Sequence, residues 1–164
     1  MPTGLSILTS VHVALSLIGI LAGFVVVAGL LTANRLDRWT TLFLAATVLT
    51  SATGYLFPFH GFSPADGVGI VSLIVLALAI VARYARHLAG GWRRTYVITA
   101  VLALYLNTFV LIVQLFQKVA ALKALAPTQS EPPFKIAQLA LLVLFIVLGV
   151  FAAIRFRVER LRAG

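Results

Sequence analysis

Five long apolar segments without a charged residue constrain the fold of this 164-residue chain more than any other feature. They cover about residues 6–31, 40–56, 67–82, 96–116 and 136–154. A bilayer core about 30 Å thick requires about 20 mostly apolar residues per helical crossing. The runs are continuous, which favours helices over barrel strands. The sequence therefore predicts an all-α integral membrane protein, a single domain over residues 1–164 that forms a bundle of five transmembrane helices.

Composition excludes several other classes of protein. Hydrophobic residues make up 62% of the chain and charged residues only 10%, whereas a soluble domain carries about 25% charged residues. A soluble globule and a disordered segment are therefore excluded. The chain has no cysteine, which also excludes disulfides, cysteine-ligated zinc and iron–sulfur clusters.

The basic residues predict the orientation of the bundle. With five crossings, ten arginines fall on one side of the membrane and three lysines, Lys118, Lys123 and Lys135, on the other. Short loops rich in basic residues stay in the cytoplasm. We therefore expect an outside N-terminus and a cytoplasmic C-terminus in a bacterial cytoplasmic (inner) membrane. The net charge of +9 is spread over loop ends, where anionic lipid headgroups suffice as partners, so we expect no nucleic-acid binding.

Small and polar residues mark one face of the first apolar segment. His12, Ser16, Gly19 and Gly23 recur at helical spacing. Gly19 and Gly23 form a small-xxx-small pair suited to close helix packing, either inside the chain or in a homo-oligomer. His12 is expected to point at another helix. The last segment carries only Gln138 as a polar residue and is expected at the periphery of the bundle.

Two groups of polar residues are candidates for a site. In the outer half of the bundle, an outward-facing polar pocket is expected to bind a ligand through His12, Ser16, Thr50, Asn107, Gln114 and Gln117. The outer loops above it contribute His60, Asp66, Gln129 and Glu131. For the inner half we expect arginines at the rim and little other polar chemistry. The aromatic residues near the helix ends are expected to be interfacial anchors: Trp39, Tyr84, Trp92 and Tyr96.

The link after the fourth segment is the longest. Residues 119–126 favour helix and are expected to prolong the fourth helix beyond the membrane until Pro127 ends it. The rest of the link is polar and proline-rich, which makes it the segment that most favours a partner or a ligand.

The chemistry of these residues leaves several functions open. Polar residues in membrane helices commonly form hydrogen bonds to neighbouring helices, which is the structural interpretation. A haem b or metal site would use His12, but no second histidine lies within an apolar segment. A quinone needs only an apolar cleft with one or two polar groups. A charge-coupled carrier is disfavoured because no carboxylate lies within an apolar segment.

The sequence favours a non-catalytic role. No metalloprotease, nucleophile-elbow or phosphate-loop motif is present. We expect a non-catalytic subunit, an assembly factor or a ligand-binding membrane component, with the lipid bilayer and other membrane proteins as partners. The alternatives are a redox-linked protein that binds haem or quinone near His12, and a small-molecule uniporter or passive pathway.

Overall fold

The computed structural model of the protein describes residues 3–58, 61 and 64–156. Within these residues the chain forms helices and contains no strand. The helices, in chain order, are α1 (Thr3–Leu31), α2 (Asp37–Gly54), α3 (Pro64–Ile80), the π-helical turn η1 (Val81–Ala85), α4 (Trp92–Lys118), α5 (Ala120–Leu125) and α6 (Pro132–Arg155).

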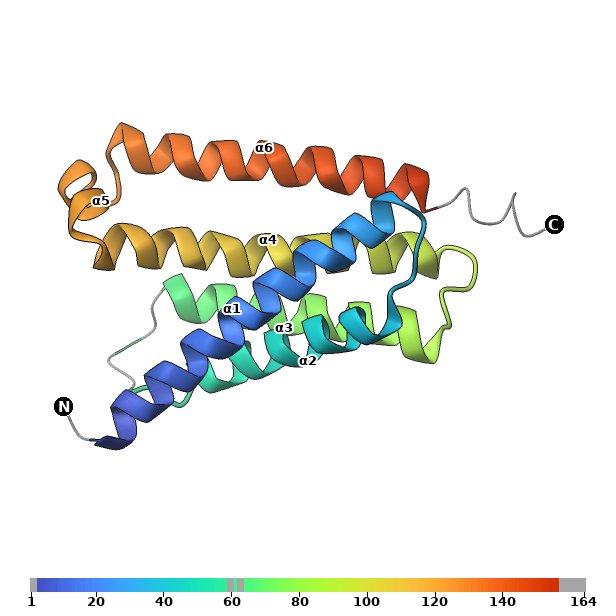
Figure 1. Ribbon diagram of the computed structural model, residues 1–164, viewed down its shortest axis with the longest axis horizontal. Helices are drawn as coiled ribbons and strands as arrows, with labels where there is room; N and C mark the ends of the chain where they lie inside the picture. The colour runs from blue at the N-terminus through green and yellow to red at the C-terminus, as the bar shows by residue number, and fades with distance from the viewer. Residues whose placement is uncertain (1–2, 59–60, 62–63, 157–164) are drawn as a thin grey trace.

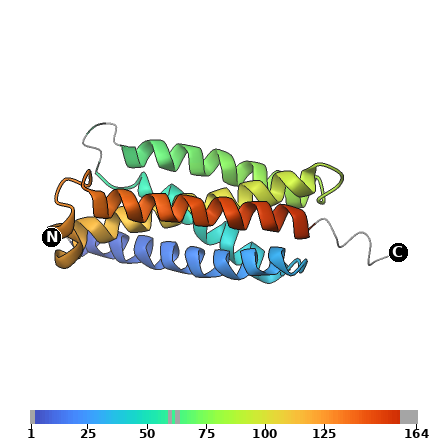
Figure 2. The same ribbon diagram turned by 90° about the horizontal axis from the view of Figure 1, so that it is seen from above.

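The long helices form one elongated bundle. Figures 1 and 2 show α1, α2, α3, α4 and α6 running along its long axis, with consecutive helices in opposite directions. One end of the bundle, here called the α5 end, holds the start of α1, the start of α6 and the short helix α5 (Figure 1). The opposite end, here called the η1 end, holds the turn η1 and the last residues of α6. The helix α4 is central because it packs against α1, α3 and α6.

Four helices are long and apolar enough to cross a membrane. They cover Gly4–Leu31, Pro64–Ala85, Trp92–Lys118 and Pro132–Arg155. The expected class, an all-helical membrane protein, is thereby confirmed. The helix α2 is not among the four candidates, because its 18 residues begin with Asp37 and Arg38 and include several threonines.

The small face of α1 packs tightly inside the chain. A Cβ atom on Gly23 would lie 2.6 Å from Leu104 Cδ1 and 2.9 Å from Phe43 Cε2. A Cβ atom on Gly19 would lie 3.0 Å from Thr47 Oγ1. The expectation of close packing is therefore confirmed, and the helices in contact with these glycines are α2 and α4 of the same chain.

Two other expectations concern α6 and residues 119–126. The peripheral position of α6 is confirmed, because only 17% of its apolar window is buried, the lowest share among the four membrane-length helices. The expectation that residues 119–126 prolong the fourth helix is wrong. Val119 is extended (φ −85°, ψ 115°) and separates α4 from α5. Val119 is β-branched and adopts the extended conformation readily, and the alanine-rich residues after it form the separate helix α5.

Candidate functional site

His12 contacts α2 near the α5 end of the bundle. Its Nδ1 lies 2.9 Å from Thr53 Oγ1. The Thr53 hydroxyl donates its proton to the Leu49 carbonyl at 2.7 Å. The Thr53 oxygen therefore accepts from His12, and this requires the tautomer with a proton on Nδ1. The imidazole also packs edge-on against the Phe57 ring, with the centroids 5.4 Å apart. His12 thus faces a neighbouring helix as expected, and in this tautomer its Nε2 is an acceptor.

Ser16 and Asn107 join α1 to α4 one helical turn further into the bundle. The Ser16 hydroxyl donates to Asn107 Oδ1 at 3.1 Å. Asn107 is 8% exposed, and its buried Nδ2 has no hydrogen-bond partner among the described residues. Gly19 allows this amide to approach the α1 backbone, because a Cβ there would lie 3.3 Å from Asn107 Nδ2. The pair is therefore a polar contact between helices that leaves one donor unused.

The other residues of the predicted pocket lie apart from this pair. Thr50 is buried and donates to the Ala46 carbonyl of its own helix at 2.9 Å. Gln114 is half-buried on α4. Gln117 is exposed near the end of α4, where its Nε2 donates to Gln129 Oε1 at 3.4 Å. The six predicted residues therefore follow α4 and its neighbours over several turns, and the hydrogen bonds gather only some of them.

The predicted outer-loop residues are found in two places. Asp66 lies in the first turn of α3, and its backbone carbonyl accepts a hydrogen bond from the Tyr55 hydroxyl at 2.9 Å. Gln129 and Glu131 lie in the turn between α5 and α6. His60 lies outside the described residues.

Glu131 organises the turn before α6. Its Oε1 accepts from the Thr128 hydroxyl at 2.7 Å and from the Thr128 backbone N–H at 3.1 Å. Its Oε2 accepts from the Ser130 N–H at 3.0 Å. These donors stabilise the charged form of the carboxylate, so the hydrogen bond from Thr128 holds the pKa of Glu131 below its ordinary value of 4.5. This carboxylate is committed to the local turn.

A second polar cluster at the η1 end was not expected from the sequence. The Arg83 guanidinium pairs with the Asp37 carboxylate through Nη2, and the same nitrogen donates to the Arg35 carbonyl at 3.3 Å. Its Cζ lies 5.1 Å from the centroid of the Tyr96 ring, within the range of a cation–π interaction. The Tyr96 hydroxyl donates to Thr40 Oγ1 at 3.4 Å. This cluster joins the loop before α2 to η1 and α4.

The η1 cluster corrects two expectations. The inner half was expected to hold little polar chemistry beyond its rim, but the Arg83 side chain is only 6% exposed. Tyr96 was expected to be an interfacial anchor, but it is 0% exposed. The π-helical turn places Arg83 inside the bundle, and such turns are frequent at functional sites. The only feature of the sequence that marks Arg83 is its position directly after an apolar run. An arginine at the membrane interface has the same position, so the sequence does not distinguish a buried arginine from an interfacial one.

An apolar layer separates the two polar clusters. Phe43 on α2 lies between Thr40 and Thr47 in sequence, and Leu104 on α4 lies between Tyr96 and Asn107. Phe43 and Leu104 are 1% and 0% exposed, and both side chains lie against Gly23 of α1. Polar groups therefore do not continue from one end of the bundle to the other through this part of the core.

The polar contacts and the fold indicate a class of protein, and they point to no particular reaction. No group of three or more metal-binding side chains occurs among the residues that the structure describes. No family model matches this chain, and no curated protein and no solved structure matches it. The fold and the helix composition define a helical membrane protein in which the pairs His12–Thr53 and Ser16–Asn107 join neighbouring helices.

Proposed function

We propose that this chain is a non-catalytic component of a bacterial cytoplasmic membrane, a subunit, assembly factor or ligand-binding protein. Its partners are the lipid bilayer and other membrane proteins. The observation that carries the proposal is the use of the interior polar groups. His12 pairs with Thr53 on α2, and Ser16 pairs with Asn107 on α4. These groups hold helices together, at about 0.6 kcal/mol for an average hydrogen bond in a membrane protein.

The proposal includes five crossings, with α2 as the second. The helix α2 packs along α1 and against α3. Thr53 near one end of α2 bonds to α1, while Thr40 near its other end bonds to α4. Four of the five threonine hydroxyls of α2 donate to carbonyls of the same helix, for example Thr47 to Phe43 at 2.7 Å, and Thr40 donates to the Arg35 carbonyl just before it. This bonding reduces the cost of placing these polar residues in lipid.

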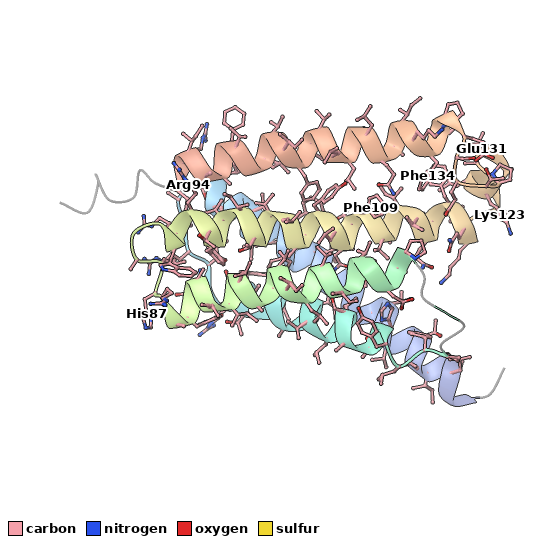
Figure 3. All side chains as sticks on the ribbon, turned by 180° about the vertical axis from the view of Figure 1, so that it is seen from behind. His87, Arg94, Phe109, Lys123, Glu131 and Phe134 are labelled. Atoms are coloured by element: carbon pink, nitrogen blue, oxygen red, sulfur yellow. The ribbon has the colours of Figure 1, made fainter. Side chains whose placement is uncertain are left out.

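The orientation in the proposal places the η1 end in the cytoplasm. Figure 3 shows His87 and Arg94 at that end, with Lys123 and Glu131 at the opposite end. Arginines are numerous in the segments that meet at the η1 end, and the positive-inside rule then favours a cytoplasmic η1 end. The N-terminus lies outside in this arrangement, and the polar site of His12, Ser16 and Asn107 belongs to the outer half.

Single cysteines test this topology directly, because the chain has no cysteine of its own. The exposed residues Arg38 and Ala89 lie at the η1 end, and Leu56 and Ala124 at the α5 end. We expect a membrane-impermeant maleimide to label Leu56→Cys and Ala124→Cys in intact spheroplasts. Arg38→Cys and Ala89→Cys should react only after lysis. Labelling of Arg38→Cys and Leu56→Cys from the same side would contradict a crossing by α2.

The absorption spectrum tests the redox alternative. We expect the purified protein to be colourless in the visible range and free of extractable quinone. A Soret band that disappears in His12→Ala would contradict the non-catalytic proposal and favour a haem ligand at Nε2. Ser10→Ala, an exposed hydroxyl on the same helix, is the matched control for loss of fold.

A further inference from the structure

Exposed arginines gather at the η1 end of the bundle, in what is here called the arginine patch. They come from the loop before α2, the first turn of α2, the residue after η1, the start of α4 and the end of α6. The members of the patch are Arg35, Arg38, Arg86, Arg94 and Arg155. Figures 1 and 2 show that these segments, which are far apart in sequence, meet at one end of the molecule.

The acidic residue that the structure describes at this end is already paired. The carboxylate of Asp37 binds the Arg83 guanidinium, which the π-helical turn η1 places inside the bundle. The other described acidic residues, Asp66 and Glu131, belong to the α5 end. Within the described part of the chain, no ion pair involves a member of the arginine patch. Its positive charge is therefore available to an anion from outside the protein.

Aromatic side chains at the same end indicate the depth of the arginine patch in the membrane. Trp39 directly follows Arg38 in α2, Tyr84 lies in η1, and both side chains are exposed. The Tyr84 hydroxyl lies 3.0 Å from Thr41 Oγ1, which joins η1 to α2 at this level. Exposed tryptophan and tyrosine side chains collect where the hydrocarbon of a bilayer meets its headgroups. We therefore expect the patch at the level of the lipid phosphates.

We propose that the arginine patch binds anionic phospholipid headgroups in preference to zwitterionic ones. A guanidinium remains charged and presents a planar fork of N–H donors that matches two oxygens of a phosphate. Several such groups together attract a headgroup with a net negative charge, whereas a choline headgroup adds a positive charge of its own. The inference specifies the lipid partner of the proposed function, but it depends neither on the number of crossings nor on the orientation in the membrane.

Tryptophan fluorescence tests the proposal at this end of the molecule, because Trp39 and Trp92 are the two tryptophans of the chain and both lie at the η1 end. Bromine atoms on a lipid acyl chain quench a tryptophan that the lipid contacts. The full chain is reconstituted in mixtures of phosphatidylcholine and phosphatidylglycerol, with either lipid brominated in turn. We expect phosphatidylglycerol to bind at least about threefold more strongly than phosphatidylcholine. Equal binding of the two lipids would overturn the proposal and leave the non-catalytic role untouched.

The arginine variant combines Arg35→Gln, Arg38→Gln and Arg94→Gln. It keeps Arg86, because that guanidinium lies 5.1 Å from the centroid of the Trp92 ring and its loss would change the fluorescence itself. The three substituted side chains are exposed, and circular dichroism checks that the helical content is unchanged. We expect this variant to bind the two lipids equally. A preference for phosphatidylglycerol as strong as that of the unchanged protein would overturn the role of the patch.

The control variant combines Lys118→Gln, Lys123→Gln and Lys135→Gln, which removes the same charge from the α5 end. Its preference for phosphatidylglycerol should stay within about twofold of that of the unchanged protein, because these lysines are remote from the patch. An equal loss in this variant would overturn the proposal, since net charge rather than position would then decide binding.

A comparison of salts distinguishes the lipid headgroup from free phosphate. The quenching is repeated in millimolar inorganic phosphate and in chloride of equal ionic strength, and we expect the same preference for phosphatidylglycerol in both. Loss of the preference in phosphate alone would assign the patch to free phosphate and overturn the lipid. Absence of quenching by either lipid would place both tryptophans outside the bilayer, which would contradict the membrane arrangement in addition to the lipid preference.

Discussion

Individual glycines and amides decide how closely the central helices of this bundle approach. Gly19 and Gly23 allow side chains of α2 and α4 to contact the backbone of α1 directly. Dispersion contacts of this kind are the main source of helix association in lipid, where apolar burial between helices gains little. Ser16 and Asn107 add a hydrogen bond to the same contact. The register of α1 against its neighbours therefore depends on a few small residues.

The substitution Gly23→Ala tests this packing. The added Cβ would lie 2.6 Å from Leu104 Cδ1 and against the Phe43 ring, so these two fully buried side chains must shift. We expect a loss of about 1–3 kcal/mol in the free energy of unfolding, as is typical of an overpacked core. Reversible unfolding in mixed detergent micelles, followed by circular dichroism, measures it. Gly4→Ala is the matched control, because no atom lies within 4 Å of its Cβ position. Equal stability of the two variants would contradict the close contact.

At the scale of elements, the turn η1 changes the role of Arg83. In the π-helical turn the side chain lies under the Tyr96 ring and contacts the loop before α2. The partner carboxylate of Asp37 is 80% exposed, whereas Arg83 is 6% exposed. The two members of the ion pair therefore contribute unequally to stability.

This inequality predicts the outcome of two substitutions. Arg83→Ala should cost about 2–4 kcal/mol of unfolding free energy, because it leaves a cavity beside Tyr96 and removes the cation–π contact. Asp37→Asn should cost less than Arg83→Ala, because Asp37 is 80% exposed and an asparagine Oδ1 still accepts a hydrogen bond from the guanidinium. The same unfolding measurement compares them. If Asp37→Asn costs as much as Arg83→Ala, the ion pair rather than the burial of Arg83 stabilises this end.

The turn between α5 and α6 depends on the ionisation of Glu131. Its hydrogen bond from Thr128 lowers the pKa below 4.5 in the folded state. The carboxylate therefore stabilises the turn at pH values above its ordinary pKa, and this stabilisation is lost as the pH falls through the lowered folded-state pKa. Amide resonances of Thr128 and Ser130 should shift with a midpoint below 4.5 in an NMR titration. Glu131→Gln should abolish that shift, and a midpoint above 4.5 would contradict the hydrogen bonds.

At the scale of the whole molecule, a buried apolar layer of Phe43 and Leu104 separates two polar clusters. His12, Ser16 and Asn107 lie toward the α5 end, and Arg83 and Tyr96 toward the η1 end. The layer of Phe43 and Leu104 between them is almost fully buried. This layer closes the region between α1, α2 and α4 in the conformation described.

The closed layer predicts the permeability of the protein. Proteoliposomes should show the same glycerol and potassium flux as protein-free liposomes, because no polar pathway crosses the apolar layer. Stopped-flow light scattering measures glycerol entry, and a potassium-sensitive dye measures ion flux. Protein-dependent flux that disappears in Asn107→Leu would contradict this prediction and favour the uniporter alternative.

The sequence predicted features that follow from local composition. The helical class, the peripheral α6 and the direction of His12 toward another helix all follow from hydropathy and helical spacing. The prediction from sequence was wrong where one local pattern is compatible with two environments, an exposed interface and a buried contact. Tyr96 and Arg83 occur at helix ends next to apolar runs, as interfacial residues do, yet both are buried. Val119 interrupts an alanine-rich segment whose composition favours helix.

The sequence by itself determined that this chain is a helical membrane protein with an uneven distribution of basic residues. Hydropathy and charge act through the solvent, so they need no knowledge of which helices are neighbours. Only the tertiary structure decided which polar groups pair, because Ser16 and Asn107 are 91 residues apart and His12 and Thr53 are 41 apart. Each of these contacts is set by helix packing, which depends on the shapes of several helices at once.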